Sequence, residues 1–248
     1  MSSRLSLLLL ACLAIAQANA GDVVNDYRSY YLSKEGVIFK ESDARSLQQF
    51  SITFDDVTRK SSNEIAVEKN VFHWEGRVNG EKYSFSLVDK SIYDSENVGP
   101  EESFVLNGKK YYFKKAKVFP GELGELDARR ASLFINKAYL CLEGVSFSAS
   151  GTSQRHVDVY FLSLRTKGPA QHFYKLPSLF ASCLGIRRDK SGNIVFPKVS
   201  YRNYESVNTA AGVTFQDYTV KAEQFIPIGS EIKADFVESE NMYKFKVQ

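Results

Sequence analysis

Short runs of alternating hydrophobic and polar residues recur along this chain. Such alternation predicts β-strands with one face on a core and the other in solvent. It is clearest over residues 71–78 and 81–88, which flank the dipeptide Asn79-Gly80. Asn-Gly between two alternating runs is the strongest short signal for a β-hairpin, because both turn positions adopt a positive φ. The pattern therefore predicts an antiparallel hairpin over residues 71–88.

A second Asn-Gly pair, Asn107-Gly108, joins two further strand-like runs. Two such turns so close together predict an antiparallel meander over residues 50–118. Residues 119–127 then interrupt the β pattern with a proline and two glycines. Because these residues favour turns and loops, we expect a connection there, and the segment is the best candidate for a boundary between two subdomains.

The rest of the chain adds further strands and a few short helices. Strand patterns recur at residues 138–148, 155–164, 218–225, 232–237 and 242–247. The valines and tyrosines of residues 23–31 fall at roughly helical spacing, residues 42–50 fit a short capped helix, and residues 127–134 fit the start of another. The predicted fold class is therefore mainly β, or α+β with few short helices, with antiparallel meander or sandwich-like sheets.

The first twenty residues have the pattern of a secretory signal peptide. Arg4 gives a positive start, Leu5 to Ala16 form an apolar run, and Ala18-Asn19-Ala20 is a small-residue cleavage site. We expect cleavage after Ala20, so that residues 21–248 form an exported protein, periplasmic or secreted. No later apolar run approaches the ~18 residues that cross a bilayer, so no transmembrane anchor is predicted in the mature chain.

The chain has three cysteines, one in the predicted signal segment and two in the mature chain. Cys12 lies in the signal segment, where its flank only faintly resembles a lipoprotein site. Cys141 and Cys183 are left in the mature chain, and an exported protein with two cysteines usually pairs them. We predict a disulfide between them, closing a loop of about forty residues that stabilises the fold by up to ~4 kcal/mol. The alternative is two buried free thiols.

Composition and charge narrow the range of partners. The chain is 44% hydrophobic and 25% charged, which is typical of a folded domain and argues against global disorder. Its 18 phenylalanines and 14 tyrosines favour strands. The net charge of +3 falls by one when Arg4 is removed, so the mature chain is too near neutrality to indicate nucleic acid or an anionic membrane as partner.

The common catalytic and cofactor signatures are absent from the sequence. It contains no G-x-S-x-G, H-E-x-x-H, Walker loop, G-x-G-x-x-G or C-x-x-C motif. We therefore predict no cofactor and favour a role other than catalysis.

Two short patterns place a histidine beside a carboxylate. They are His73-x-Glu75 and His156-x-Asp158, each in a predicted strand, where residues i and i+2 share a face. If the two strands converged, the four side chains could bind Zn²⁺ or provide a base with an orienting acid. The alternative is that each pair lies on the solvated face of a sheet.

Basic and aromatic residues are interleaved over residues 109–117. The candidate binding residues there are Lys109, Lys110, Tyr111, Tyr112, Lys114, Lys115 and Lys117. Such a surface suits an acidic polysaccharide, a lipid headgroup or an acidic protein face. The alternative is an edge strand that its lysines protect from aggregation.

Three functional hypotheses remain. The first is an exported, non-enzymatic binding protein for a protein partner or a small ligand, such as an adaptor, inhibitor or immunity-type factor. The second is an exported hydrolase or metal-binding protein that uses His73, Glu75, His156 and Asp158. The third is an envelope-associated protein that uses the basic stretch of residues 109–117.

Overall fold

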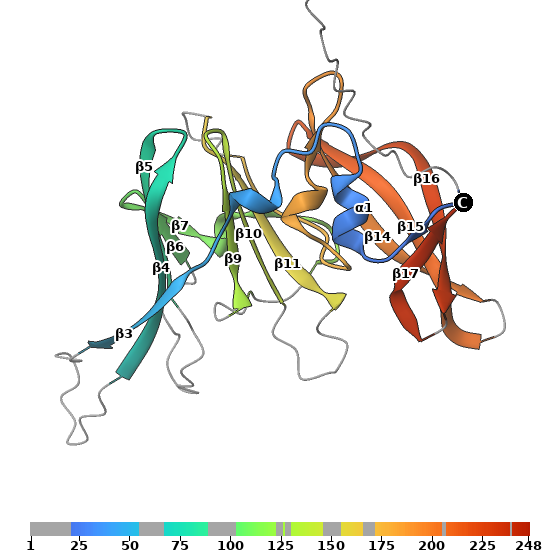
Figure 1. Ribbon diagram of the computed structural model, residues 1–248. Coiled ribbons are helices and arrows are strands. Elements are labelled where there is room, and N and C mark those ends of the chain that lie inside the picture. The colour runs from blue at the N-terminus through green and yellow to red at the C-terminus, as the bar shows by residue number, and fades with distance from the viewer. Residues whose placement is uncertain are drawn as a thin grey trace, which may run out of the picture.

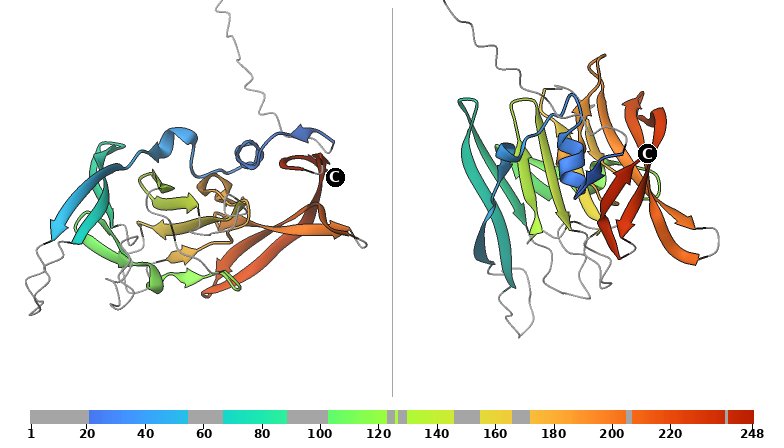
Figure 2. Two further views of the ribbon diagram at one scale, coloured as in Figure 1. Left: turned by 90° about the horizontal axis from the view of Figure 1, so that it is seen from below. Right: turned by 45° about the vertical axis from the view of Figure 1, so that its right-hand side comes forward.

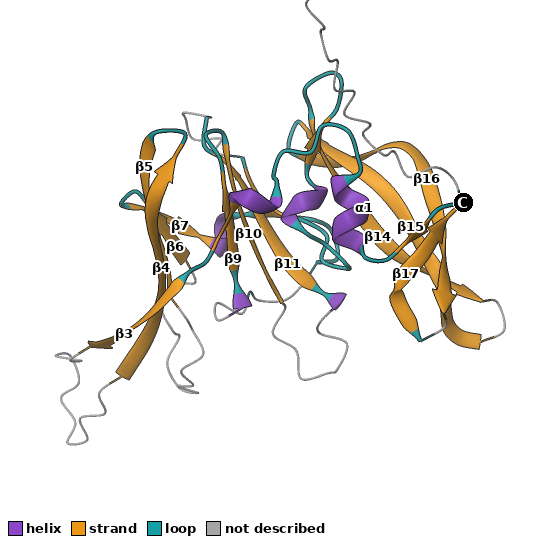
Figure 3. Cartoon of the chain, viewed as in Figure 1, coloured by secondary structure: helices purple, strands orange, loops and turns teal. Residues whose placement is uncertain are grey.

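Three mainly antiparallel β-sheets dominate the computed structural model, as the ribbon and secondary-structure views show (Figures 1 and 3). The described residues are 21–54, 67–88, 103–122, 126, 130–145, 155–165, 172–204, 207–238 and 240–248. The predicted signal peptide and Cys12 lie outside them. The prediction of a mainly β fold with antiparallel sheets is confirmed.

The first sheet, sheet C, is a meander in chain order. Its strands are β3 (Gln48–Phe54), β4 (Val67–Val78), β5 (Glu81–Val88), β6 (Ser103–Leu106) and β7 (Lys109–Tyr112). Asn79 and Gly80 turn β4 into β5 with φ of 49° and 86°, and Asn107 and Gly108 turn β6 into β7 with φ of 49° and 78°. Both predicted hairpins are thus present, because these residue types tolerate positive φ.

The second sheet, sheet B, has six strands. In spatial order they are β2 (Ala44–Arg45), β9 (Ser132–Ile135), β10 (Tyr139–Val145), β11 (Val157–Ser163), β12 (Phe173–Lys175) and β8 (Lys117–Val118). The pairing of β12 with β8 is parallel and the others are antiparallel. β8 and β9, on either side of residues 119–127, belong to this same sheet.

The third sheet, sheet A, contains the longest strands. In spatial order they are β1 (Val23–Val24), β17 (Asn241–Val247), β16 (Gln224–Glu238), β15 (Val207–Lys221), β14 (Ile194–Tyr204) and β13 (Arg187–Arg188). The helix α1 (Tyr27–Leu32) follows β1 in the chain. It lies next to the 3-10 helix η5 (Cys183–Gly185). Two other 3-10 helices are η1 (Glu41–Asp43) and η2 (Phe113–Lys115).

Sheet B is the middle layer, with sheet C on one side and sheet A on the other (Figures 1 and 2). Its strands alternate between two cores. On β10, Cys141 packs into the core shared with sheet A, whereas Leu140 and Leu142 pack into the core shared with sheet C. A sheet buried on both faces needs apolar residues at successive positions, which explains the unbroken hydrophobic runs of β10 and β11.

The short helix predicted over residues 42–50 is present only at residues 42–43, which belong to η1, and the helix predicted over residues 127–134 is wrong at residues 132–134. After η1 the backbone is extended, and β2 and β3 pair with β9 and β4. Residues 132–134 are part of β9, while residues 127–129 lie outside the described residues. Backbone pairing in two sheets satisfies the donors and acceptors that a single helical turn would otherwise satisfy locally.

The single strand predicted over residues 218–225 is instead a hairpin. β15 ends at Lys221 and β16 begins at Gln224, and the turn residues Ala222 and Glu223 have φ of 47° and 62°. Neither residue type signals a turn with positive φ, which normally uses glycine or asparagine. The sequence pattern therefore missed this turn.

Candidate functional site

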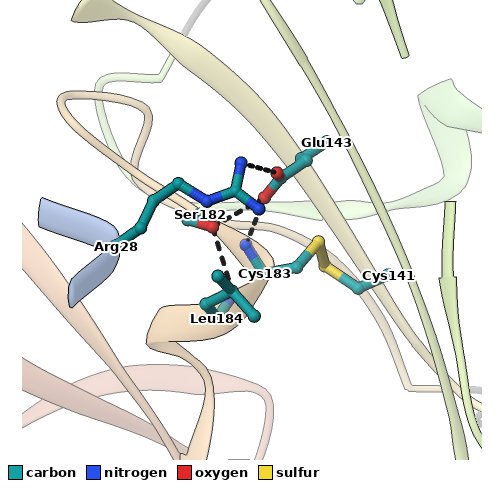
Figure 4. Close-up of a disulfide and its surroundings, with 6 residues drawn as sticks. All are labelled: Arg28, Cys141, Glu143, Ser182, Cys183 and Leu184. Atoms are coloured by element: carbon teal, nitrogen blue, oxygen red, sulfur yellow. Dashed lines mark hydrogen bonds and ion pairs between the residues drawn. A yellow bond between two sulfur atoms is a disulfide. The ribbon is translucent and has the colours of Figure 1, made fainter. Parts of the chain in front are cut away.

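The predicted disulfide between Cys141 and Cys183 is present (Figure 4). The two Cα atoms are 5.9 Å apart, and both side chains are fully buried. The bond ties η5 to β10 in the middle of sheet B. Because the chain continues from η5 into β13, the disulfide also fixes the start of β13.

A buried carboxylate beside the disulfide joins three elements (Figure 4). Glu143 Oε2 accepts hydrogen bonds from Ser182 Oγ at 2.8 Å and from the Cys183 backbone N–H at 2.6 Å. Its Oε1 lies 3.6 Å from Arg28 Nη1 on α1. Burial raises the pKa of Glu143, and the two hydrogen bonds and Arg28 oppose that rise. Helix α1, β10 and η5 therefore meet at one polar junction.

Helix α1 is short but held on several sides. Asp26 caps it by accepting from the Ser29 backbone N–H at 2.8 Å. Tyr27, Tyr30 and Tyr31 form its buried face, as their helical spacing predicts. The Tyr31 hydroxyl donates to the Phe180 carbonyl at 2.8 Å, and the Tyr27 hydroxyl donates to the Met242 carbonyl at 3.1 Å. The helix is thus fixed to the chain just before η5 and to β17 of sheet A.

The chain after α1 runs alongside β13. Val37 and Arg187 form an antiparallel bridge, and the Arg188 backbone N–H donates to the Gly36 carbonyl at 2.8 Å. Gly36 has a φ of 76°, and a Cβ there would lie 2.1 Å from the Arg188 carbonyl oxygen. Only glycine fits this approach. The contact places Lys34, just before it, on the same side of the fold as Arg187.

These elements border a small, partly open cavity of about 70 Å³ between α1 and sheet A. Its apolar wall is formed by Pro197, Phe215 and Ile232, and its polar wall by Tyr30, Lys34, Arg187 and Asp217. This space suits a few waters or a ligand of a few non-hydrogen atoms, well below the roughly 300–1,000 Å³ of a drug-sized pocket. A second cavity, of about 10 Å³, has room for about one water.

Tyr30 lines this cavity, and its buried hydroxyl is an unsatisfied donor among the described residues. The residue is 3% exposed, and among the described residues its hydroxyl has no hydrogen-bond partner. Burial raises its pKa, the negative charge of Asp217 adds to the rise, and Arg187 opposes it. The phenol therefore stays protonated at neutral pH and can donate a hydrogen bond. Buried hydroxyls without a partner are rare in folded proteins.

The charged residues of the cavity are arranged as one pair and one additional cation. Arg187 forms an ion pair with Asp217 across sheet A. Lys34 Nζ lies over the Tyr30 ring, 4.0 Å from its centroid. Burial lowers the pKa of Lys34, Arg187 lowers it further, and Asp217 opposes the change. The charged groups lining the cavity therefore sum to one positive charge.

A β-bulge positions Asp217. The register of β15 against β16 shifts between Phe215 and Asp217. The Gln216 side-chain amide donates to the Ile228 carbonyl at 2.9 Å and to the Asp217 carbonyl at 3.1 Å, so it satisfies acceptors at the interrupted ladder. Bulges are common next to functional sites because they change the direction of a side chain.

Comparisons with known proteins assign no family or function to this chain. The chain matches no protein-family model, no curated protein and no solved structure.

The two predicted histidine–carboxylate pairs lie on different sheets. His73 Nε2 is 3.5 Å from Glu75 Oε1 on β4 of sheet C, and the Glu75 side chain is 51% exposed. His156 is exposed beside Ser178, with Nδ1 and Oγ 3.1 Å apart, whereas Asp158 on β11 is fully buried. Across the described residues, no three or more His, Cys, Asp or Glu side chains form a group that could hold a metal ion.

Asp158 has a different partner from the one the sequence pattern proposed. Lys175 Nζ on β12 lies 2.9 Å from Asp158 Oδ1, and the two side chains are 4% and 0% exposed. Lys175 also lies over the Tyr160 ring, 5.5 Å from its centroid. The pair is enclosed between sheets B and C. His156 does not share this environment because it precedes β11, and the side chains alternate between the two cores only within that strand.

The basic stretch of residues 109–117 runs along sheet edges. β7 is the last strand of sheet C and β8 is the last strand of sheet B in the described part of the chain. The lysines there are exposed, and Lys109 and Lys110 lie over the rings of Tyr111 and Tyr112 at 5.0 and 4.8 Å. This placement agrees with lysines that protect an edge strand.

No described helix has the length and apolar character needed to cross a membrane.

The sequence patterns pointed to part of the cavity only. The helical spacing of Tyr27, Tyr30 and Tyr31 indicated the helix, but not that the Tyr30 hydroxyl lacks a hydrogen-bond partner among the described residues. Arg187 and Asp217 carry no motif, because they meet only through the pairing of β13 with β14 and of β14 with β15. Lys34 joins them through the bridge between Val37 and Arg187.

Proposed function

We propose that the mature chain is an exported, non-enzymatic binding protein that holds a small polar ligand in the cavity beside α1. The observation that carries this proposal is the Tyr30 hydroxyl, which is buried in the cavity wall without a hydrogen-bond partner among the described residues. Leaving a buried hydroxyl unpaired costs about 1–3 kcal/mol. A ligand that accepts its hydrogen bond would recover that free energy.

The polar groups of the cavity suit binding better than catalysis. Arg187 is occupied by its ion pair with Asp217. Tyr30 remains protonated because its pKa is raised, so it serves as a donor rather than a base. A nucleophile with an adjacent base is not among the residues that line the cavity.

Export is tested on the protein recovered from its producing cells. N-terminal sequencing of the exported fraction is expected to begin at Gly21. Protein that retains Met1 and stays in the cytoplasm would contradict export without bearing on the cavity.

Binding is tested by thermal unfolding of the mature chain with three small probes: acetate, acetamide and ethylamine. A ligand that binds the folded state raises the unfolding midpoint. The best small ligands gain about 1.5 kcal/mol per non-hydrogen atom, so affinities weaker than micromolar are expected and the probes are used at millimolar concentration.

The matched variants are Tyr30→Phe and Tyr27→Phe, which each remove one hydroxyl from the buried face of α1. We expect at least one probe to stabilise the wild type and Tyr27→Phe but not Tyr30→Phe. If none of the three probes gives a shift that depends on Tyr30, the cavity binds only water and the proposed function is wrong.

A further inference from the structure

The charge of the cavity restricts the class of ligand it can hold, provided that the proposed function is right. Its charged side chains are Lys34, Arg187 and Asp217, of which the last two neutralise each other as an ion pair. Lys34 is left as the excess positive charge. A ligand with one negative charge would therefore make the site neutral.

The Tyr30 hydroxyl and the Lys34 ammonium would contact the same part of the ligand. Lys34 Nζ lies over the ring of Tyr30, so the ammonium and the phenol belong to one corner of the cavity. Among the described residues, no carboxylate forms an ion pair with Lys34. The phenol donates one hydrogen bond, and an ionised oxygen is its strongest acceptor.

The remaining walls limit the size and the total charge of the ligand. Phe215, which packs against the Tyr30 ring with centroids 4.6 Å apart, and Ile232 offer an apolar surface, and the volume of about 70 Å³ admits only a few non-hydrogen atoms. Asp217 would repel a second negative group. A dicarboxylate or an inorganic dianion therefore fits less well than a monoanion with a short apolar tail.

We infer that the cavity binds a small free monocarboxylate, whose carboxylate accepts a hydrogen bond from Tyr30 and pairs with Lys34, and whose apolar end packs on Phe215 and Ile232.

The test compares acetate with acetamide, which has nearly the same shape but no charge. Titration calorimetry on the mature chain is expected to show acetate binding at least tenfold more tightly. Tyr30→Phe should weaken acetate binding about tenfold, because a hydrogen bond to a charged group is lost. Lys34→Met should abolish the preference for acetate over acetamide. Lys137→Met, which removes a surface lysine paired with Glu81, should leave it unchanged.

N-acetylglycine distinguishes a free acid from the carboxyl end of a peptide chain. It carries the same carboxylate on a peptide unit, and we expect at least tenfold weaker binding than acetate because the cavity is too small for that unit. Tighter binding of N-acetylglycine would assign the site to a chain end and overturn the inference of a free small acid.

Two further outcomes separate this inference from the proposed function. If acetamide or ethylamine binds as tightly as acetate and the binding depends on Tyr30, the ligand class is wrong but the cavity is still a binding site. If acetate binds equally to the wild type, Tyr30→Phe and Lys34→Met, the anion associates elsewhere and the inference is overturned.

Discussion

The backbone N–H of Cys183 donates to Glu143 Oε2 over 2.6 Å, and Cys183 is disulfide-bonded to Cys141, two residues before Glu143 on β10. Residues i and i+2 of a strand share a face, so the covalent bond and the hydrogen bond reach η5 from the same side of sheet B. The chain leaves this anchor for Gly185 and Arg187, which line the cavity. The position of the cavity wall is therefore set from the middle sheet.

Replacing both Cys141 and Cys183 with alanine is expected to lower the free energy of unfolding by about 2–4 kcal/mol. The bond spans 42 residues, and a loop of that length loses substantial entropy in the unfolded chain when it is closed. Urea unfolding of the mature protein measures the change. The wild type under reducing conditions that break the bond should match the double variant. A difference below about 1 kcal/mol would show that the bond adds little beyond packing.

Glu143 is expected to make stability depend on pH. Because burial raises its pKa above the ordinary 4.5, the folded state binds the proton more tightly than the unfolded state. The stabilising contribution of this proton to the free energy of unfolding is complete below pH 4.5. It is lost as the pH rises through the higher pKa of the folded state. Glu143→Gln cannot ionise. The free energy of unfolding of the wild type should therefore fall relative to Glu143→Gln as the pH rises above about 4.5.

Urea titrations of the wild type and Glu143→Gln at several pH values test this pH dependence. Glu143→Ala serves as a control, because it leaves the buried Cys183 N–H without an acceptor and should be about 1–3 kcal/mol less stable than Glu143→Gln at every pH. A wild-type stability that runs parallel to Glu143→Gln would mean that the hydrogen bonds and Arg28 cancel the effect of burial.

Much of the fold could be predicted because it depends on local patterns. The Asn79-Gly80 and Asn107-Gly108 turns require residues that tolerate positive φ, and those residues are visible in the sequence. The disulfide followed from counting cysteines after the signal segment was set aside. The helix predicted over residues 42–50 ends at Asp43 because pairing with β9 and β4, which are distant in sequence, determines the conformation after it.

The cavity could not be predicted, because its polar residues meet only in the folded chain. Arg187 and Asp217 are 30 residues apart and come together across β14. The unpaired state of the Tyr30 hydroxyl depends on every neighbour around it and leaves no trace in the sequence. The same limit affected Asp158, whose i−2 neighbour His156 suggested a pair while its actual partner, Lys175, lies on another strand.

The buried Asp158–Lys175 pair is expected to be strongly coupled. Lys175→Met leaves a buried carboxylate without its cation, and Asp158→Asn leaves a buried ammonium without its anion, so each should cost about 3–5 kcal/mol. The double variant removes both charges and should cost clearly less than the sum. A double-mutant cycle measured by urea unfolding gives the coupling free energy. Additive effects would mean that neither charge depends on the other.

The turn between β15 and β16 offers a stabilising change. Ala222 and Glu223 both have positive φ, at 47° and 62°, a conformation that costs side chains other than asparagine and glycine roughly 1 kcal/mol. Replacing Ala222 with asparagine and Glu223 with glycine would install the residue types found at the two predicted hairpins. Both side chains are exposed, so little packing is lost. We expect the double variant A222N/E223G to raise the free energy of unfolding by about 0.5–1 kcal/mol in urea titrations. The control A222G/E223A keeps a side chain at the second position and should gain less, because the penalty at residue 223 remains. Equal gains in the two variants would show that the penalty lies at residue 222 alone.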